Sequence, residues 1–151
     1  MNHSEALSFD ASEQAILDRI DGRLHAQGWA KHVTAARLLR GWQALSTSVH
    51  RYRGTVDDYT NDLTGRDALE VVLRECNEPL RGKLLILIEQ ADGEFLAATQ
   101  DDTGCVLRRY FRINESSEWW WKRTPTAGPL AEYLNSAQHR LTKDPGKPSS
   151  T

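Results

Sequence analysis

The chain has 151 residues, a net charge of −2, 26% charged residues and 39% apolar residues. This length fits one domain, and the composition is that of an ordinary globular protein. No apolar stretch approaches the roughly 20 residues that span a bilayer, and the N-terminus lacks the basic start and apolar run of a secretory signal. Cys76 and Cys105 fit no metal or redox spacing. We therefore expect two reduced thiols in a cytoplasmic protein with no membrane association.

The first helix is predicted to begin at Asp10, because Asp10 and Glu13 have the spacing of a capping box. A single apolar stripe follows and is made of Ile16, Leu17, Ile20 and Leu24. Gly28 favours the end of this helix, since glycine readily takes the left-handed conformation after a helix. The residues before this helix, 1–9, are expected to be flexible, and so is the polar tail over 143–151. A single domain is predicted over 10–142.

The strongest helical pattern covers residues 31–53. Its apolar residues recur at alternating spacings of three and four, as in a heptad repeat. They are Ala35, Leu38, Trp42, Leu45, Val49 and Tyr52. We interpret this seam as the contact face of the central helix in a bundle, with a homodimer seam as the alternative. The chain is thus expected to be a monomer or a homodimer.

Two further helical regions are predicted. Residues 55–76 resemble two helical pieces, because Thr64 and Asp67 have the spacing of a fresh cap and Gly65 lies between them. The next helix is expected from Pro79 to about Thr99, where proline suits the first position of a helix. Its apolar arc is wide, which indicates a central position. A buried strand over 84–88 is the alternative, and the length of the periodic pattern favours the helix.

A small β-hairpin near residues 105–124 is predicted next. Residues 105–113 alternate and are rich in aromatic and β-branched types, which favours a strand. Residues 119–124 would form the returning strand, up to Pro125. A last short helix is expected to begin at Gly128 and Pro129 and to reach Ala137. The predicted fold class is mainly α: a four- to five-helix bundle with a small C-terminal β-hairpin.

Charge is unevenly distributed along the chain. Residues 30–54 hold no acid, residues 55–102 hold twelve acids against four bases, and residues 103–125 hold five bases against two acids. These segments either pair across the seams between helices or leave an acidic surface that steers a basic partner. The acidic candidates for such a surface are Asp57, Asp58 and Asp62 at the start of the third helical region.

Three consecutive tryptophans, Trp119 to Trp121, end the predicted hairpin. In a strand Trp119 and Trp121 would share one face, which we assign to the core, and Trp120 would lie on the other. The same outer face would carry cations, namely Arg108, Arg112 and Lys122. Exposed Trp and Arg suit a protein contact, and stacking rings with phosphate-binding cations suit single-stranded nucleic acid. A purely structural role comes before both interpretations, because tryptophan is rarely fully buried and a partly exposed triplet needs no function.

Catalytic and metal motifs are not found in this sequence. The histidines have no repeated ligand spacing, no glycine-rich phosphate loop occurs, and no serine or cysteine lies in a nucleophile motif. The sequence therefore disfavours an enzyme and predicts no cofactor and no metal. It favours a non-enzymatic protein-binding domain of the inhibitor, immunity or adaptor kind, whose undetermined partner is expected to be basic. A single-stranded nucleic-acid-binding module using the Arg/Trp hairpin, or a small-molecule-binding domain, is the alternative.

Overall fold

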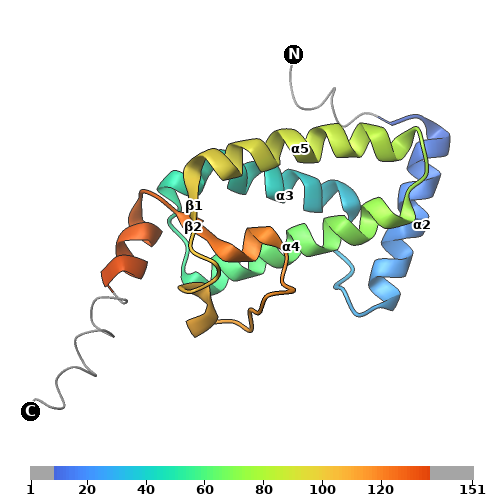
Figure 1. The fold of residues 1–151 in the computed structure, drawn as a ribbon. Helices are drawn as coiled ribbons and strands as arrows, with labels where there is room; N and C mark the ends of the chain where they lie inside the picture. Colours follow the sequence, from blue (N-terminus) through green and yellow to red (C-terminus); the bar gives the residue numbers. More distant parts are fainter. Residues whose placement is uncertain (1–8, 137–151) are drawn as a thin grey trace, which may run out of the picture.

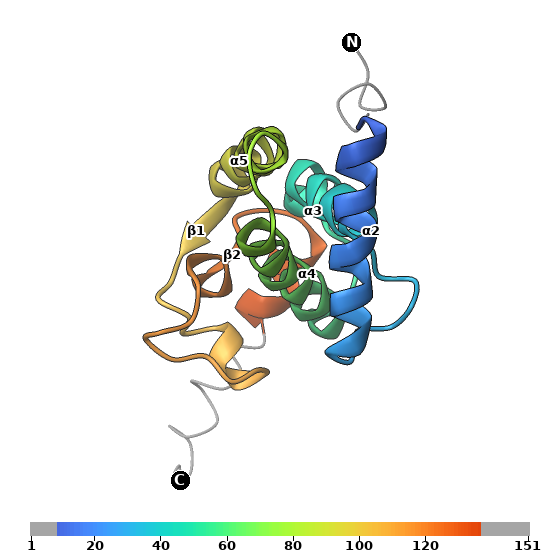
Figure 2. The same ribbon diagram turned by 90° about the vertical axis from the view of Figure 1, so that its right-hand side faces the viewer.

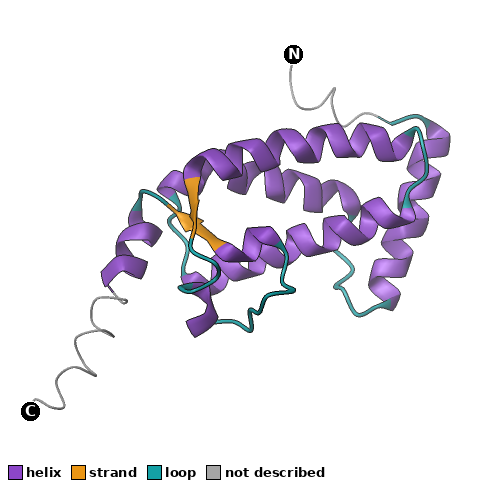
Figure 3. Cartoon of the chain, in the orientation of Figure 1, coloured by secondary structure: helices purple, strands orange, loops and turns teal. Residues whose placement is uncertain are grey.

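The computed structural model describes residues 9–136. Its elements are α2 (Ala11–Ala26), α3 (Ala35–Ser48), the 3-10 turn η1 (Val49–Arg51), α4 (Val56–Glu75), α5 (Leu80–Ala98), β1 (Thr99–Asp101), the 3-10 turns η2 (Leu107–Arg109) and η3 (Trp119–Lys122), and β2 (Arg123–Pro125). Helices α3, α4 and α5 lie side by side, α2 crosses one end of them, and the strands lie at the other end (Figure 1). Figure 2 shows this crossing with α2 in front, and Figure 3 shows how short the strands are. The predicted fold class is confirmed.

Helix α2 begins and ends where the sequence predicts. The Asp10 carboxylate accepts the Glu13 backbone N–H at 2.8 Å, and the Glu13 carboxylate accepts the Asp10 backbone N–H at 3.0 Å. Gly28 follows the helix with φ +107°, the left-handed region that favours glycine. Glu13 is buried and also accepts a hydrogen bond from the Lys83 ammonium at 2.8 Å, so the cap of α2 is held against α5.

Helix α3 is the central helix of the bundle, because it packs against both α4 and α5. It begins at Ala35 rather than near Lys31, and the Thr34 hydroxyl caps it by accepting the Arg37 backbone N–H at 3.2 Å. The predicted seam is therefore used within the chain. Because α3 packs against two helices, its buried face is wider than a single heptad stripe. Leu39 is therefore buried, whereas Leu38, which the heptad pattern selected, is half-buried.

Helix α4 is continuous, and the predicted break near Gly65 is wrong. Thr64 does not cap a second helix, because its hydroxyl donates back to the Asn61 carbonyl. A side chain at Gly65 would face α3, with its Cβ 3.7 Å from a methyl carbon of Leu38. Packing of the apolar face against α3 and α5 thus keeps the helix intact across a local break signal.

Helix α5 is confirmed over the stretch for which a strand was the alternative. Its buried face contains Leu84, Ile88 and Phe95. The wide apolar arc does not make α5 central, because α3 holds that place and Ile86 is 61% exposed. The apolar run at 84–88 thus has only one face in the core.

The strand pair lies elsewhere than predicted. Thr99 pairs with Pro125 and Asp101 with Arg123 in an antiparallel ladder, so β1 directly continues α5. Residues 105–113 form no strand. The turn at Thr103 and Gly104, both with positive φ, leads into η2 instead. Val106, Leu107 and Ile113 join the core from irregular structure, whereas Tyr110 and Phe111 stay exposed, because tertiary packing overrides local strand propensity.

The last described helical residues are 129–136, and the predicted start after Gly128 is confirmed. Gly128 has φ +98°, and a Cβ at this position would lie 2.3 Å from the His50 carbonyl oxygen. This close approach brings the last helix against η1. Ala137, the flexible stretch predicted before Phe9, the domain end at residue 142 and the tail over 143–151 lie outside the described residues.

Candidate functional site

The tryptophan triplet forms a 3-10 turn, not a strand. Trp120 is 1% exposed, Trp121 is buried, and Trp119 is half-buried. The predicted alternation is therefore wrong, because a 3-10 turn places residues about 120° apart around its axis and turns Trp120 and Trp121 inward together. Trp120 lies in the core and is not available on a surface.

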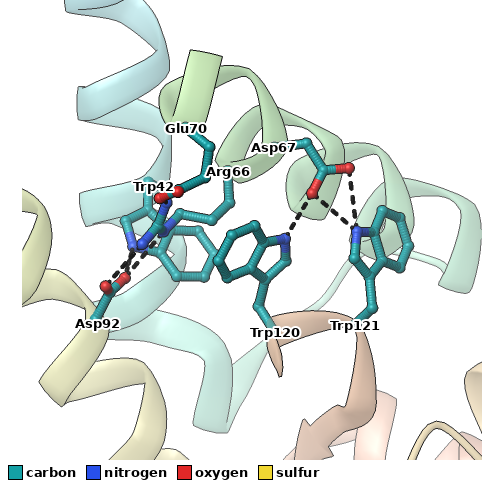
Figure 4. A network of polar contacts seen from close by, with 7 residues as sticks. All are labelled: Trp42, Arg66, Asp67, Glu70, Asp92, Trp120 and Trp121. Atoms are coloured by element: carbon teal, nitrogen blue, oxygen red, sulfur yellow. Dashed lines mark hydrogen bonds and ion pairs between the residues drawn. The ribbon is translucent and has the colours of Figure 1, made fainter. Parts of the chain in front are cut away.

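Asp67 of α4 holds both buried indoles in place (Figure 4). Its carboxylate accepts the Trp120 indole N–H at 2.8 Å and the Trp121 indole N–H at 3.0 and 3.1 Å from its two oxygens. Burial raises the pKa of Asp67, although the indole hydrogen bonds and the nearby Arg66 act to lower this pKa. Asp67 thus satisfies two donors that would otherwise be buried without a partner.

Arg66 is buried beside this carboxylate and joins α4 to α5. Its guanidinium donates to both oxygens of Asp92, at 3.0 and 2.8 Å, and to Glu70 at 2.6 Å. Trp42 of α3 donates its indole N–H to the same Asp92 at 2.8 Å. The guanidinium also lies over the Trp120 ring, 4.2 Å from the centroid. One buried cation therefore connects three helices and η3.

The members of this network bind one another across the elements of the fold. It anchors the connection between the strands, residues 102–122, onto α4 and α5. One part of the network has a local signal, because Arg66 and Glu70 have i,i+4 spacing on a helix. The pairing of Arg66 with Asp92 spans 26 residues and carries no local signal, so sequence reasoning missed it.

The anchored connection presents a loop of five consecutive exposed residues, 108–112, which we call the 108–112 loop. The Phe111 ring stacks on the Trp121 indole with centroids 4.5 Å apart and planes 9° apart. Arg108 donates to the Thr103 and Ile113 carbonyls at 3.2 and 3.4 Å, which closes the base of the loop. The loop is therefore held at both its base and its tip.

A groove of about 480 Å³ lies beside this loop, and we call it the tyrosine groove. Tyr110 and Tyr133 line it, and they are 36% and 50% exposed. Val56 and Leu130 are buried residues that also line it. Arg53 and Asp57 add one charge of each sign. The groove joins the start of α4, the 108–112 loop and the last helix at one end of the bundle.

The predicted acidic residues do lie together at the start of α4, but two of them have intramolecular partners. The Asp58 carboxylate accepts the Thr55 backbone N–H at 3.0 Å as part of a capping box. The Asp62 carboxylate accepts the Tyr52 hydroxyl at 2.7 Å, and burial raises the pKa of Asp62. Asp57 is exposed and lines the tyrosine groove.

The predicted cationic residues do not share one strand face with Trp120. Arg112 lies in the exposed loop and lines a second groove, of about 380 Å³, together with Phe111 and Trp121. The Lys122 ammonium donates to the Glu115 carbonyl at 2.9 Å. Arg109, which sequence reasoning did not select, is exposed and makes no ion pair with any residue between 9 and 136.

The described part of the chain holds no group of three or more His, Cys, Asp or Glu residues arranged to bind a metal. Within the same residues no helix combines the length and hydropathy needed to cross a bilayer. Cys76 is buried and Cys105 is exposed, and neither is in a disulfide. Comparison with protein-family models, curated proteins and solved structures found no match.

Proposed function

We propose that this chain is a non-enzymatic protein-binding domain that contacts its partner through a basic-aromatic surface. This surface consists of Arg53, Arg109, Tyr110, Phe111, Arg112 and Tyr133. The observation that carries the proposal is the exposure of Tyr110 and Tyr133 at a groove with apolar walls, with Phe111 also exposed on the adjoining loop between two arginine-bearing grooves. Tyr and Arg are the residue types that most often dominate the energy of protein interfaces.

The partner expected at this surface is an acidic segment with an apolar side chain that enters the tyrosine groove. Arg53, Arg109 and Arg112 form no ion pair within residues 9–136, so their charges are open to a carboxylate from outside. The acidic candidates selected from the sequence are less open, since Asp58 and Asp62 already accept hydrogen bonds. A basic partner at these acids stays a prediction, and we prefer the acidic partner.

Single-stranded nucleic acid is the second candidate, because arginines lie beside exposed rings in the 108–112 loop. The acids around the loop count against it. Asp57 lines the tyrosine groove, and Asp67, Glu70 and Glu118 line the groove on the other side of Phe111. These carboxylates would repel a phosphate backbone that follows either groove.

Site-specific photo-crosslinking in the native host tests this proposal. A benzoylphenylalanine replaces Tyr133 or Phe111 in turn, and Ile86 is the matched control because it is also exposed and apolar but lies on α5. The proposal expects one protein to be crosslinked from both surface positions and not from position 86. The purified partner should then bind wild type, and Tyr133→Ala should weaken binding about tenfold or more.

Charge reversal separates the partner classes. Arg53→Glu and Arg109→Glu should weaken an acidic protein partner, and the loss should shrink at high salt because exposed charges are screened. Fluorescence anisotropy with a fluorescein-labelled oligothymidylate measures binding of single-stranded nucleic acid. If the oligonucleotide binds at micromolar concentration, and Tyr110→Ala and Phe111→Ala abolish this binding, the second candidate replaces the proposal. Equal crosslinking from position 86 would refute a specific surface.

A further inference from the structure

A third groove, of about 590 Å³, lies between α3, α4 and the connection that follows α2. It shares no residue with the tyrosine groove. We call it the α3–α4 groove. Its apolar lining includes the half-buried side chains of Trp29, Val33 and Leu38. Gly41 and Gly65 present bare backbone to it, so the space between the two helices stays open there.

Charge in the α3–α4 groove is asymmetric. Arg37 on α3 and His32 in the connection before α3 line the groove, and an adjoining hollow is lined by the same two residues and by Arg40. Neither arginine forms an ion pair within residues 9–136. The α4 side supplies Asn61, Thr64 and Asp62, whose carboxylate already accepts the Tyr52 hydroxyl. With Arg40 of the adjoining hollow, two arginines on α3 stand against one carboxylate, Asp62 on α4, so the α3 side of the groove is the positive side.

We propose that the α3–α4 groove binds a small organic anion with a flat apolar body, for example an aromatic carboxylate or sulfonate. The ring would pack against Trp29 and Leu38, and the anionic group would face Arg37 and Arg40. A guanidinium binds such a group through charge-assisted hydrogen bonds, and an indole offers its face to a ring. Pockets for small molecules commonly combine apolar walls with a few converging polar groups. This inference is independent of the proposed protein-binding surface.

Gly41 provides a way to fill the groove without disturbing the fold. A Cβ at Gly41 would meet no heavy atom within 4 Å, and the same holds at Gly93 on α5. Both glycines are exposed in helix interiors, where leucine is the better helix former. Gly41→Leu therefore places a side chain at the groove, and Gly93→Leu is a matched control that lines none of the grooves described above.

The probe is 1-anilinonaphthalene-8-sulfonate, titrated against the full chain by fluorescence, with two-dimensional NMR to locate it. We expect saturable binding that shifts the Gly41 and Gly65 amide signals and the Trp29 indole signal. Gly41→Leu and Arg37→Gln should each weaken binding about tenfold or more. For Arg37→Gln, this loss corresponds to one charge-assisted hydrogen bond. Gly93→Leu should bind as wild type does. Circular dichroism confirms that each variant is folded.

The uncharged analogue N-phenyl-1-naphthylamine tests the need for an anion, and it should bind about tenfold more weakly than the sulfonate. Equal affinity for the two compounds would overturn the anion preference. Unchanged sulfonate binding by folded Gly41→Leu, or NMR shifts confined to residues outside the α3–α4 groove, would overturn the site itself. None of these measurements involves Tyr110, Tyr133 or a protein partner, so this inference and the proposed function fail separately.

Discussion

The guanidinium carbon of Arg66 lies 4.2 Å from the centroid of the Trp120 ring, in a part of the core where both side chains are almost fully buried. A guanidinium is weakly hydrated and planar, so it can stack on an indole at a modest desolvation cost. The bidentate contact with Asp92 supplies the opposite charge. The core thus contains a charged centre that is paired, hydrogen-bonded and covered by an aromatic ring.

Trp120 should be the most sensitive member of the triplet. Trp120→Ala removes a fully buried ring, the cover of Arg66 and one donor to Asp67, so we expect a loss of about 3–5 kcal/mol in the free energy of unfolding. Trp119→Ala should cost clearly less, because Trp119 is only half-buried. Urea denaturation of both variants measures the difference. A larger loss for Trp119 would contradict the inward position of Trp120.

Arg66 should be needed for stability because its loss leaves the half-buried Asp92 carboxylate without its cation. Arg66→Ala is expected to cost about 3–5 kcal/mol, as for other buried ion pairs broken on one side. Arg74→Ala, an exposed arginine on the same helix with no ion pair in the described part, is the control and should change stability by less than about 0.5 kcal/mol. Similar losses for the two variants in chemical denaturation would show that Arg66 is not part of the core.

Local signals in the sequence predicted the helices, and long-range contacts decided the rest. The capping pair Asp10 and Glu13 and the apolar pattern after Pro79 placed α2 and α5 correctly, because caps and periodicity act within a few residues. The predicted helix break at Gly65 and the predicted outward position of Trp120 were wrong. Both depend on packing against segments distant in sequence: Leu38 of α3 in one case, and Arg66 and Asp67 in the other.

The same limit applies to the candidate sites. Sequence reasoning selected Arg112 and Asp57, which are exposed beside the grooves that flank the 108–112 loop. It did not select Tyr133 or Arg53, because nothing in the sequence shows that the last helix and the start of α4 meet Tyr110 around one groove. Only the tertiary fold brings these three segments together.

The phase of α3 gives a direct comparison of neighbouring leucines. Leu39 is 1% exposed and Leu38 is half-buried, so Leu39→Ala should cost about 2–5 kcal/mol and Leu38→Ala less. Both substitutions remove the same atoms from adjacent helical positions, which controls for helix propensity. Thermal and urea denaturation provide the measurement. A larger loss for Leu38→Ala than for Leu39→Ala would mean that the heptad seam, rather than the observed buried face, describes the packing of α3.

The pH dependence of stability should reveal Asp67. Burial raises its pKa above the ordinary value of 3.8, against the opposing effect of the Trp121 and Trp120 hydrogen bonds. The folded state therefore holds this proton more tightly than the unfolded state does. The contribution of Asp67 to stability is fully present below the ordinary pKa and is lost as pH rises through the folded pKa.

Asp67→Asn removes this titration and keeps a carbonyl oxygen for the indoles, so the stability of wild type minus that of Asp67→Asn should fall as pH rises from about 3.5 to 7. Trp121→Phe sharpens the test. It removes an indole N–H whose hydrogen bond lowers the pKa of Asp67. The stability of Trp121→Phe minus that of the double variant Trp121→Phe, Asp67→Asn should therefore fall more with rising pH than the wild-type difference does. Urea denaturation at half-unit pH steps gives both curves. A wild-type difference that stays constant, or rises with pH, would show that burial does not control this carboxylate.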